Sequence, residues 1–130
     1  MKPSSLFGHV CELLEILLRD SRPADHVIDV FFRQRRYLGS HDRRELAESV
    51  YGILRHRRLL QAIVARVDEE KTLTPSWLLA AYKIHFEKHA PASVSEASPL
   101  THEQTQKIAM HSPAELGQGN IGVRLSFPDW

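Results

Sequence analysis

The sequence predicts an all-α protein with about five core helices and an irregular C-terminal tail. Apolar residues recur at helical spacing through most of the first 89 positions. Serine, threonine and proline stand where helices should begin, and glycine stands where one should end. The only alternating run, 123–127, is too short and isolated to predict a sheet. A chain of 130 residues suits one domain followed by a tail.

The first two predicted helices are short and amphipathic. The first covers about 4–20, with leucines along one face and a serine available as N-cap. Pro23 suits the first turn of the second, which ends in the basic run Arg33–Arg36. Gly39 then marks a turn before the next helical segment.

The segment 40–67 carries the strongest helical pattern in the chain. Ser40 is a good N-cap, and the apolar face continues to residue 67. Because one unbroken helix of this length is long for a small domain, we expect two helices with a break near His56-Arg57. Gly52 should cost about 1 kcal/mol relative to alanine in a helix interior. We therefore expect another backbone to lie close to it.

The rest of the chain is less regular. Thr74-Pro75 opens a helix that should run to about His89. The small, polar, proline-containing stretch 90–98 predicts a loop or linker. A short helix over 101–110 is expected next, and the glycine- and proline-containing stretch 111–130 has no helical period.

Arginines crowd the middle of the sequence. Between Arg33 and Arg58, eight arginines face three carboxylates, which gives +5 in a chain whose total charge is +1. Guanidinium groups present forked donors that match phosphate oxygens, so this concentration favours RNA as a partner. The candidate RNA-binding residues are these arginines and one tyrosine: Arg35, Arg36, Arg43, Arg44, Tyr51, Arg55, Arg57 and Arg58.

The arrangement of these residues leaves alternatives open. If the helix is continuous, Arg44, Glu48, Tyr51, Arg55 and Arg58 form one stripe, on which the tyrosine could stack a base. The alternative is a solvated face on which Arg44 pairs with Glu48 and Tyr51 fills a groove between helices. A further alternative is that the arginines dock onto an acidic surface of another domain.

Catalysis is not expected from this chain alone. Its one cysteine, Cys11, cannot form an internal disulfide and lies in an apolar helical run, which suits a buried thiol in a reducing cytoplasm. No signal-like start or membrane-length apolar run is present, so no membrane partner is expected. We expect no catalytic residue in this chain.

Two further motifs are weak. His85 and His89 are four residues apart, but no third metal ligand accompanies them, so no metal site is expected. Residues 117–122 read GxGxxG without the strand and helix that a dinucleotide site requires. A linker is the better interpretation, and no cofactor site is expected.

A longer pattern gives these features a context. It consists of Asp42-Arg43, Leu46, Val50–Arg55 and Leu59. The pattern resembles the NusB-like domain at the N-terminus of the Sun/Fmu family of RNA cytosine-5 methyltransferases, over roughly Leu6 to His89. The resemblance implies a NusB-like helical bundle. Free-standing NusB proteins, which act in transcription antitermination, share that fold.

A second resemblance lies at Val123–Trp130, which is similar to the segment leading into the methyltransferase part of that family. The stretch after His89 departs from the family pattern, which continues with further helices. The implied organisation has three parts: a NusB-like RNA-binding domain at 1–90, a linker at 91–122 that includes the short helix, and at 123–130 the start of a connection to a missing methyltransferase domain.

The resemblance also implies a function. In this family two cysteines act on the base, and S-adenosylmethionine binds a Rossmann-like sheet; neither belongs to this chain. The expected role is that of an RNA-binding N-terminal module, which positions RNA for the catalytic domain of the same protein. The expected RNA is ribosomal, namely 16S rRNA. The alternatives are a free-standing antitermination factor or a protein-docking module, and a homodimer stays open.

Overall fold

The computed structural model describes residues 1–113, which form seven α-helices and one short 3-10 helix. No strand occurs within these residues, so the all-α prediction is confirmed. The elements are α1 (Pro3–Arg19), α2 (Ala24–Arg33), α3 (Ser40–Arg55), α4 (Arg57–Val67), η1 (Glu69–Lys71), α5 (Pro75–His85), α6 (Pro91–Ala97) and α7 (His102–Ala109).

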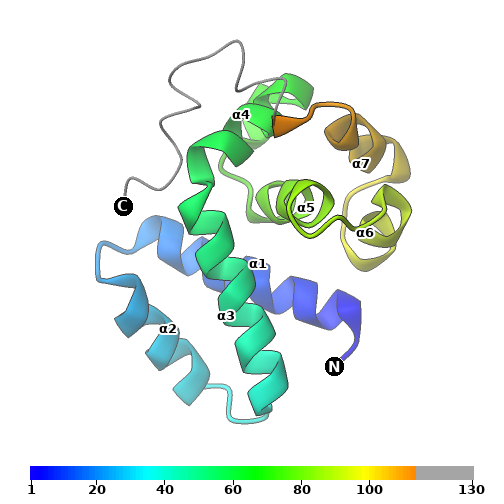
Figure 1. Ribbon diagram of the computed structural model, residues 1–130. Coiled ribbons are helices and arrows are strands. Elements are labelled where there is room, and N and C mark those ends of the chain that lie inside the picture. Colours follow the sequence, from blue (N-terminus) through cyan, green and yellow to red (C-terminus); the bar gives the residue numbers. More distant parts are fainter. Residues whose placement is uncertain (114–130) are drawn as a thin grey trace.

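Two helices organise the bundle (Figure 1). Helix α1 packs against α2, α3, α5 and α6, and α5 packs against α1, α3, α4, α6 and α7. Their central position explains their composition, because Leu13 and Leu14 of α1 and the run Leu78–Ala81 of α5 are completely buried. Helices α2 and α3 lie on one side of α1, and α4, α6 and α7 surround α5.

The expected break within 40–67 is confirmed at His56. Its backbone angles, φ −107° and ψ 24°, separate α3 from α4. The His56 ring stacks on Phe86 with centroids 4.3 Å apart, and Phe86 stacks on Tyr82 at 5.6 Å. The residue that interrupts the helix is therefore held by aromatic side chains from the end of α5.

Gly52 has the close neighbour that its position requires, but this neighbour is a side chain rather than a backbone. A Cβ atom at Gly52 would lie 2.2 Å from the hydroxyl oxygen and 2.5 Å from Cζ of Tyr82. Such distances are far inside van der Waals contact, so only glycine allows the Tyr82 ring to pack against α3. The prediction of a close backbone is wrong, because the aromatic ring occupies that space.

The C-terminal part differs from the sequence prediction. The stretch expected as a loop at 90–98 contains helix α6, with Pro91 at its first position. Val94 and Leu100 supply buried anchors, with 1% and 5% of their surface exposed. Proline is common both in linkers and at the start of helices, and Pro91 starts α6.

The short helix expected at 101–110 is confirmed as α7, and Thr101 with Gln104 forms a capping box at its start. Helices α6 and α7 pack on each other and on α5. The packed helices thus extend past the boundary predicted at residue 90, and α5 ends at His85 rather than His89.

Gly52→Ala should destabilise the protein because its new methyl group overlaps the Tyr82 ring. Overpacking costs about 1–3 kcal/mol, and the better helix propensity of alanine returns about 0.5–1 kcal/mol, so we expect a net loss of about 1–2 kcal/mol in urea unfolding. Gly8 in α1 is the matched control, since nothing lies within 4 Å of a Cβ there. Gly8→Ala should therefore stabilise. A stabilising Gly52→Ala would contradict the packing.

Candidate nucleic-acid interface

The exposed arginines predicted as a site lie at the two ends of α3. Near its start are Arg36, Arg43 and Arg44, called here the loop arginines; near its end are Arg55, Arg57 and Arg58, the junction arginines. All six residues are exposed. Since α3 has 16 residues, it is about 24 Å long at 1.5 Å per residue. The predicted single patch is therefore two groups joined by one helix, whose ends are visible in Figure 1.

The helix break changes the predicted stripe. Arg58 lies in the first turn of α4, beyond the interruption at His56, and so does not continue the α3 face. The stripe on α3 is limited to Arg44, Glu48, Tyr51 and Arg55. The stripe that includes Arg58 required a continuous helix, and this condition is not met, because the predicted break at His56 separates α3 from α4.

Three other arginines of the described chain have carboxylate partners. Arg19 pairs with Glu15 at 2.7 Å, and Arg33 pairs with Asp29 one helical turn before it. Arg22 holds Asp20 at 2.6 Å, and its hydrogen bonds lower the pKa of that carboxyl to about 2. These arginines are engaged within their own helix or turn.

Arg35, one of the predicted RNA-binding residues, is engaged in the fold. Its Nη2 lies 3.1 Å from a Glu12 carboxylate oxygen, and only 18% of its side chain is exposed. It also donates to the Phe31 carbonyl oxygen at 3.3 Å, and its guanidinium lies 3.7 Å from the centroid of the Phe31 ring. Arg35 links the segment after α2 to α1, so its guanidinium group is not exposed to solvent as those of the loop arginines are.

The carboxylates near the loop arginines are directed elsewhere. Asp42 lies 3.9 Å from the Met1 amino group, and Glu45 lies 3.6 Å from Nε2 of His41. Within residues 1–113, no ion pair joins a carboxylate to any of Arg36, Arg43, Arg44, Arg57 or Arg58. The alternative in which Arg44 pairs with Glu48 is thus not observed in this part of the chain.

Tyr51 contacts a neighbouring helix, in line with the alternative that it packs between helices, through a hydrogen bond that the sequence did not predict. Its hydroxyl donates a hydrogen bond to the Asp25 carboxylate in the first turn of α2. This bond, together with desolvation and the Asp25 charge, raises the pKa of Tyr51. The side chain therefore links α3 to α2, and 40% of the residue surface is still exposed.

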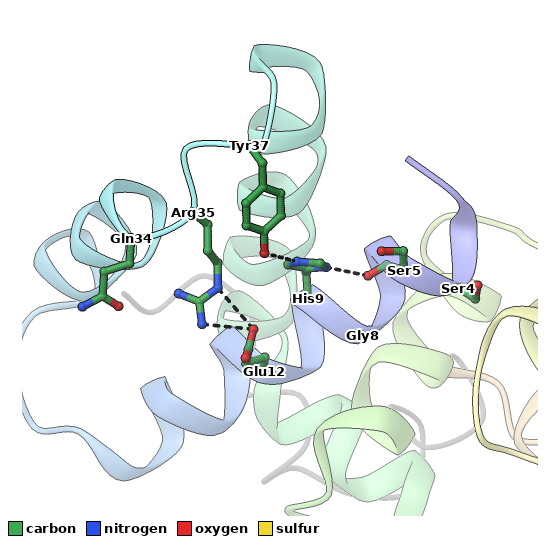
Figure 2. Close-up of a pocket in the computed structure, with 8 residues that line it drawn as sticks. All are labelled: Ser4, Ser5, Gly8, His9, Glu12, Gln34, Arg35 and Tyr37. Carbon is green, nitrogen blue, oxygen red and sulfur yellow. Dashed lines mark hydrogen bonds and ion pairs between the residues drawn. The ribbon is translucent and has the colours of Figure 1, made fainter.

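Tyr37 is a surface residue that the sequence interpretation missed as a site. It follows the basic run directly, is 68% exposed and donates its hydroxyl to His9. Figure 2 shows it beside Arg35 over α1, next to an open pocket. The signal in the sequence was an aromatic residue immediately after Arg36, in a stretch predicted only as a connection.

Other candidate chemistry finds no support among the described residues. Burial raises the pKa of the Cys11 thiol to about 12, so the thiolate form is not populated near neutral pH.

His85 uses Nε2 to contact the Ile108 carbonyl oxygen at 2.8 Å. No group of three potential metal ligands is found in residues 1–113, and none of their helices is long and apolar enough to cross a membrane. The GxGxxG motif and Val123–Trp130 lie outside the described residues.

No protein-family model matches the chain, and comparisons with curated proteins and with solved structures find no significant match.

The Tyr51–Asp25 bond should contribute measurably to stability. Tyr51→Phe removes the donor while keeping the ring, and we expect a loss of about 0.5–1.5 kcal/mol in urea unfolding. A double-mutant cycle with Asp25→Ala separates this bond from the effect of Asp25 on the α2 dipole. A coupling energy near zero would show that the two side chains do not interact.

Stability should fall as the pH drops from about 7 toward 5. Burial lowers the pKa of both His56 and His85 below the ordinary value of 6.5. Below that value the unfolded chain takes up protons that the folded chain does not, so the unfolded state is favoured. Thermal unfolding across this range should show the decline.

His85→Gln keeps an amide donor for the Ile108 carbonyl oxygen but cannot titrate, so it should flatten this decline. The control is His89→Gln, which changes an exposed histidine just beyond the same helix. Equal pH profiles for His85→Gln and wild type would contradict the assignment.

Proposed function

We propose that this domain binds the phosphate backbone of RNA through the loop and junction arginines. The observation that carries the proposal is the contrast between two classes of arginine. Arg19, Arg22, Arg33 and Arg35 have carboxylate partners, whereas within residues 1–113 Arg36, Arg43, Arg44, Arg57 and Arg58 have none.

Guanidinium groups that have no carboxylate partner suit a polyanion. Each presents forked donors to phosphate oxygens, and a nucleic acid supplies phosphates at both ends of α3. Contacts of this kind give affinity and register without selecting a base sequence. Arg35 is not part of this proposal because its guanidinium is bound to Glu12 and covers Phe31.

We further propose that the domain is the N-terminal module of an RNA cytosine-5 methyltransferase of the Sun/Fmu type, acting on ribosomal RNA. The support is the residue pattern, above all Val50–Arg55, within which Gly52 makes its required contact with Tyr82. Catalysis with S-adenosylmethionine belongs in this proposal to a separate domain that carries two cysteines. A coding sequence after Trp130 without such a domain would contradict this second part.

Replacing two junction arginines should weaken RNA binding and its salt dependence together. In fluorescence anisotropy with a labelled mixed-sequence RNA, Arg57→Ala/Arg58→Ala should lower the log–log salt slope by about 1.4–1.8, which corresponds to two phosphate contacts. The same analysis of Arg43→Ala/Arg44→Ala tests the loop arginines separately.

The control removes the same charge from a different class of arginine. Arg19→Ala/Arg33→Ala replaces two exposed residues that are already paired with carboxylates. It should change the slope little. An equal decrease of the salt slope in the junction variant and in the control would show that only net charge matters. If the wild-type protein does not bind RNA at low salt, the proposal is overturned in favour of protein docking.

A further inference from the structure

We propose that Tyr37 and the pocket beside it hold one unpaired nucleobase of single-stranded RNA, an inference that rests on the RNA-binding function proposed above. Tyr37 is the most exposed tyrosine, phenylalanine or tryptophan among the described residues, at 68%. An exposed ring beside unneutralised arginines is the combination by which proteins bind single strands, because every base offers a flat face for stacking.

A short hydrogen-bond chain fixes the Tyr37 ring in place (Figure 2). Nδ1 of His9 lies 2.8 Å from the Ser5 carbonyl oxygen, and Nε2 of His9 lies 2.8 Å from the Tyr37 hydroxyl. A carbonyl oxygen only accepts, so Nδ1 carries a proton, and in the neutral imidazole Nε2 then accepts from the tyrosine hydroxyl. The tautomer and the direction of both bonds follow from this chain.

Two further contacts restrict this tyrosine. The His9 and Tyr37 rings meet edge to face, with centroids 5.7 Å apart and planes at 66°. The next residue, Leu38, is 1% exposed and anchors the backbone in the core. An exposed ring that is already oriented loses less side-chain entropy when a base stacks on it.

The pocket next to the ring offers room and polar edges. Its volume is about 640 Å³, within the range of small-molecule sites. Gly8 of α1 forms part of its wall, and a Cβ there would meet no atom within 4 Å. Figure 2 shows the side chains of Ser4, Glu12 and Gln34 around it, which supply donors and acceptors for a base edge.

Phosphate-binding groups lie beside this pocket along the chain. Arg36 immediately precedes Tyr37, and Arg43 and Arg44 are the fourth and fifth residues of α3, a few positions later. All three are exposed. A strand with one base on Tyr37 can therefore place flanking phosphates near the loop arginines. A duplex cannot use the ring in the same way, because its bases are stacked and paired inside.

The test compares single-stranded and duplex RNA of the same sequence by fluorescence anisotropy. Tyr37→Ala should weaken single-strand binding about five- to hundred-fold, the usual loss for one stacked base. It should leave the log–log salt slope and duplex binding unchanged, because it removes no phosphate contact. Tyr37→Phe, which keeps the ring, should retain most of the affinity.

Gly8→Met provides an independent probe of the pocket. The new side chain points into open space, so it should not disturb folding, yet it occupies the volume beside Tyr37 and should also weaken single-strand binding. Unchanged single-strand affinity in both Tyr37→Ala and Gly8→Met would overturn this inference. The proposed function would then still stand if the junction-arginine variant lowered the salt slope. If the wild-type protein does not bind RNA, both this inference and the proposed function are contradicted.

Discussion

The close packing of Tyr82 on Gly52 is the contact on which the arrangement of the arginines depends. It brings α3 against α5 at a point where any side chain on α3 would collide with the ring. Four residues after Tyr82, just beyond the end of α5, Phe86 stacks on both Tyr82 and His56. The same face of α5 therefore fixes the last turn of α3 and the residue at which the helix breaks, and Arg57 and Arg58 emerge on a second helix as a result.

For several arginines, the presence or absence of an ion pair follows from the spacing of nearby carboxylates. Arg19 and Arg33 have an acid four residues earlier, and each pairs with it. Neither Arg43, Arg57 nor Arg58 has a carboxylate three or four residues away in either direction. Arg44 has one at Glu48, but no ion pair between them occurs in the described chain. Local sequence thus separates most of the neutralised arginines from those that stay available to a ligand.

Much of the fold could be predicted because its helices carry their own periodic signal. Helices α1 to α5 follow long apolar patterns, and the break at His56 follows from segment length. Helix α6 could not be recognised in this way, since seven residues with one buried valine show no period. The sequence shows that Gly52 lowers the stability of its helix relative to alanine. It does not show which residue lies against Gly52, because Tyr82 is thirty positions away and is brought close only by packing.

The candidate site was predicted less completely because it depends on contacts between helices. Arg35 looked like its neighbours in the basic run, yet Glu12, on another helix, neutralises it. Tyr51 looked free to stack, yet Asp25 accepts its hydroxyl. The sequence predicts Tyr37 only as part of a turn. The structure shows that its ring is exposed and that its hydroxyl is hydrogen-bonded to His9 on α1.

The two ends of α3 are chemically unequal, and this gives the proposed interface a direction. The junction end offers charge alone, which binds any phosphate backbone and permits sliding. The loop end offers charge together with a fixed ring and a pocket, which favour an unpaired base. In the proposed interface, a strand that spans both ends would therefore be bound more favourably in one register, with its unpaired segment at the start of α3, than when it is shifted along the helix. Such a register is what a module needs if it is to present RNA to a partner in a defined position, and it follows from placing a single oriented tyrosine at one end of a charged helix.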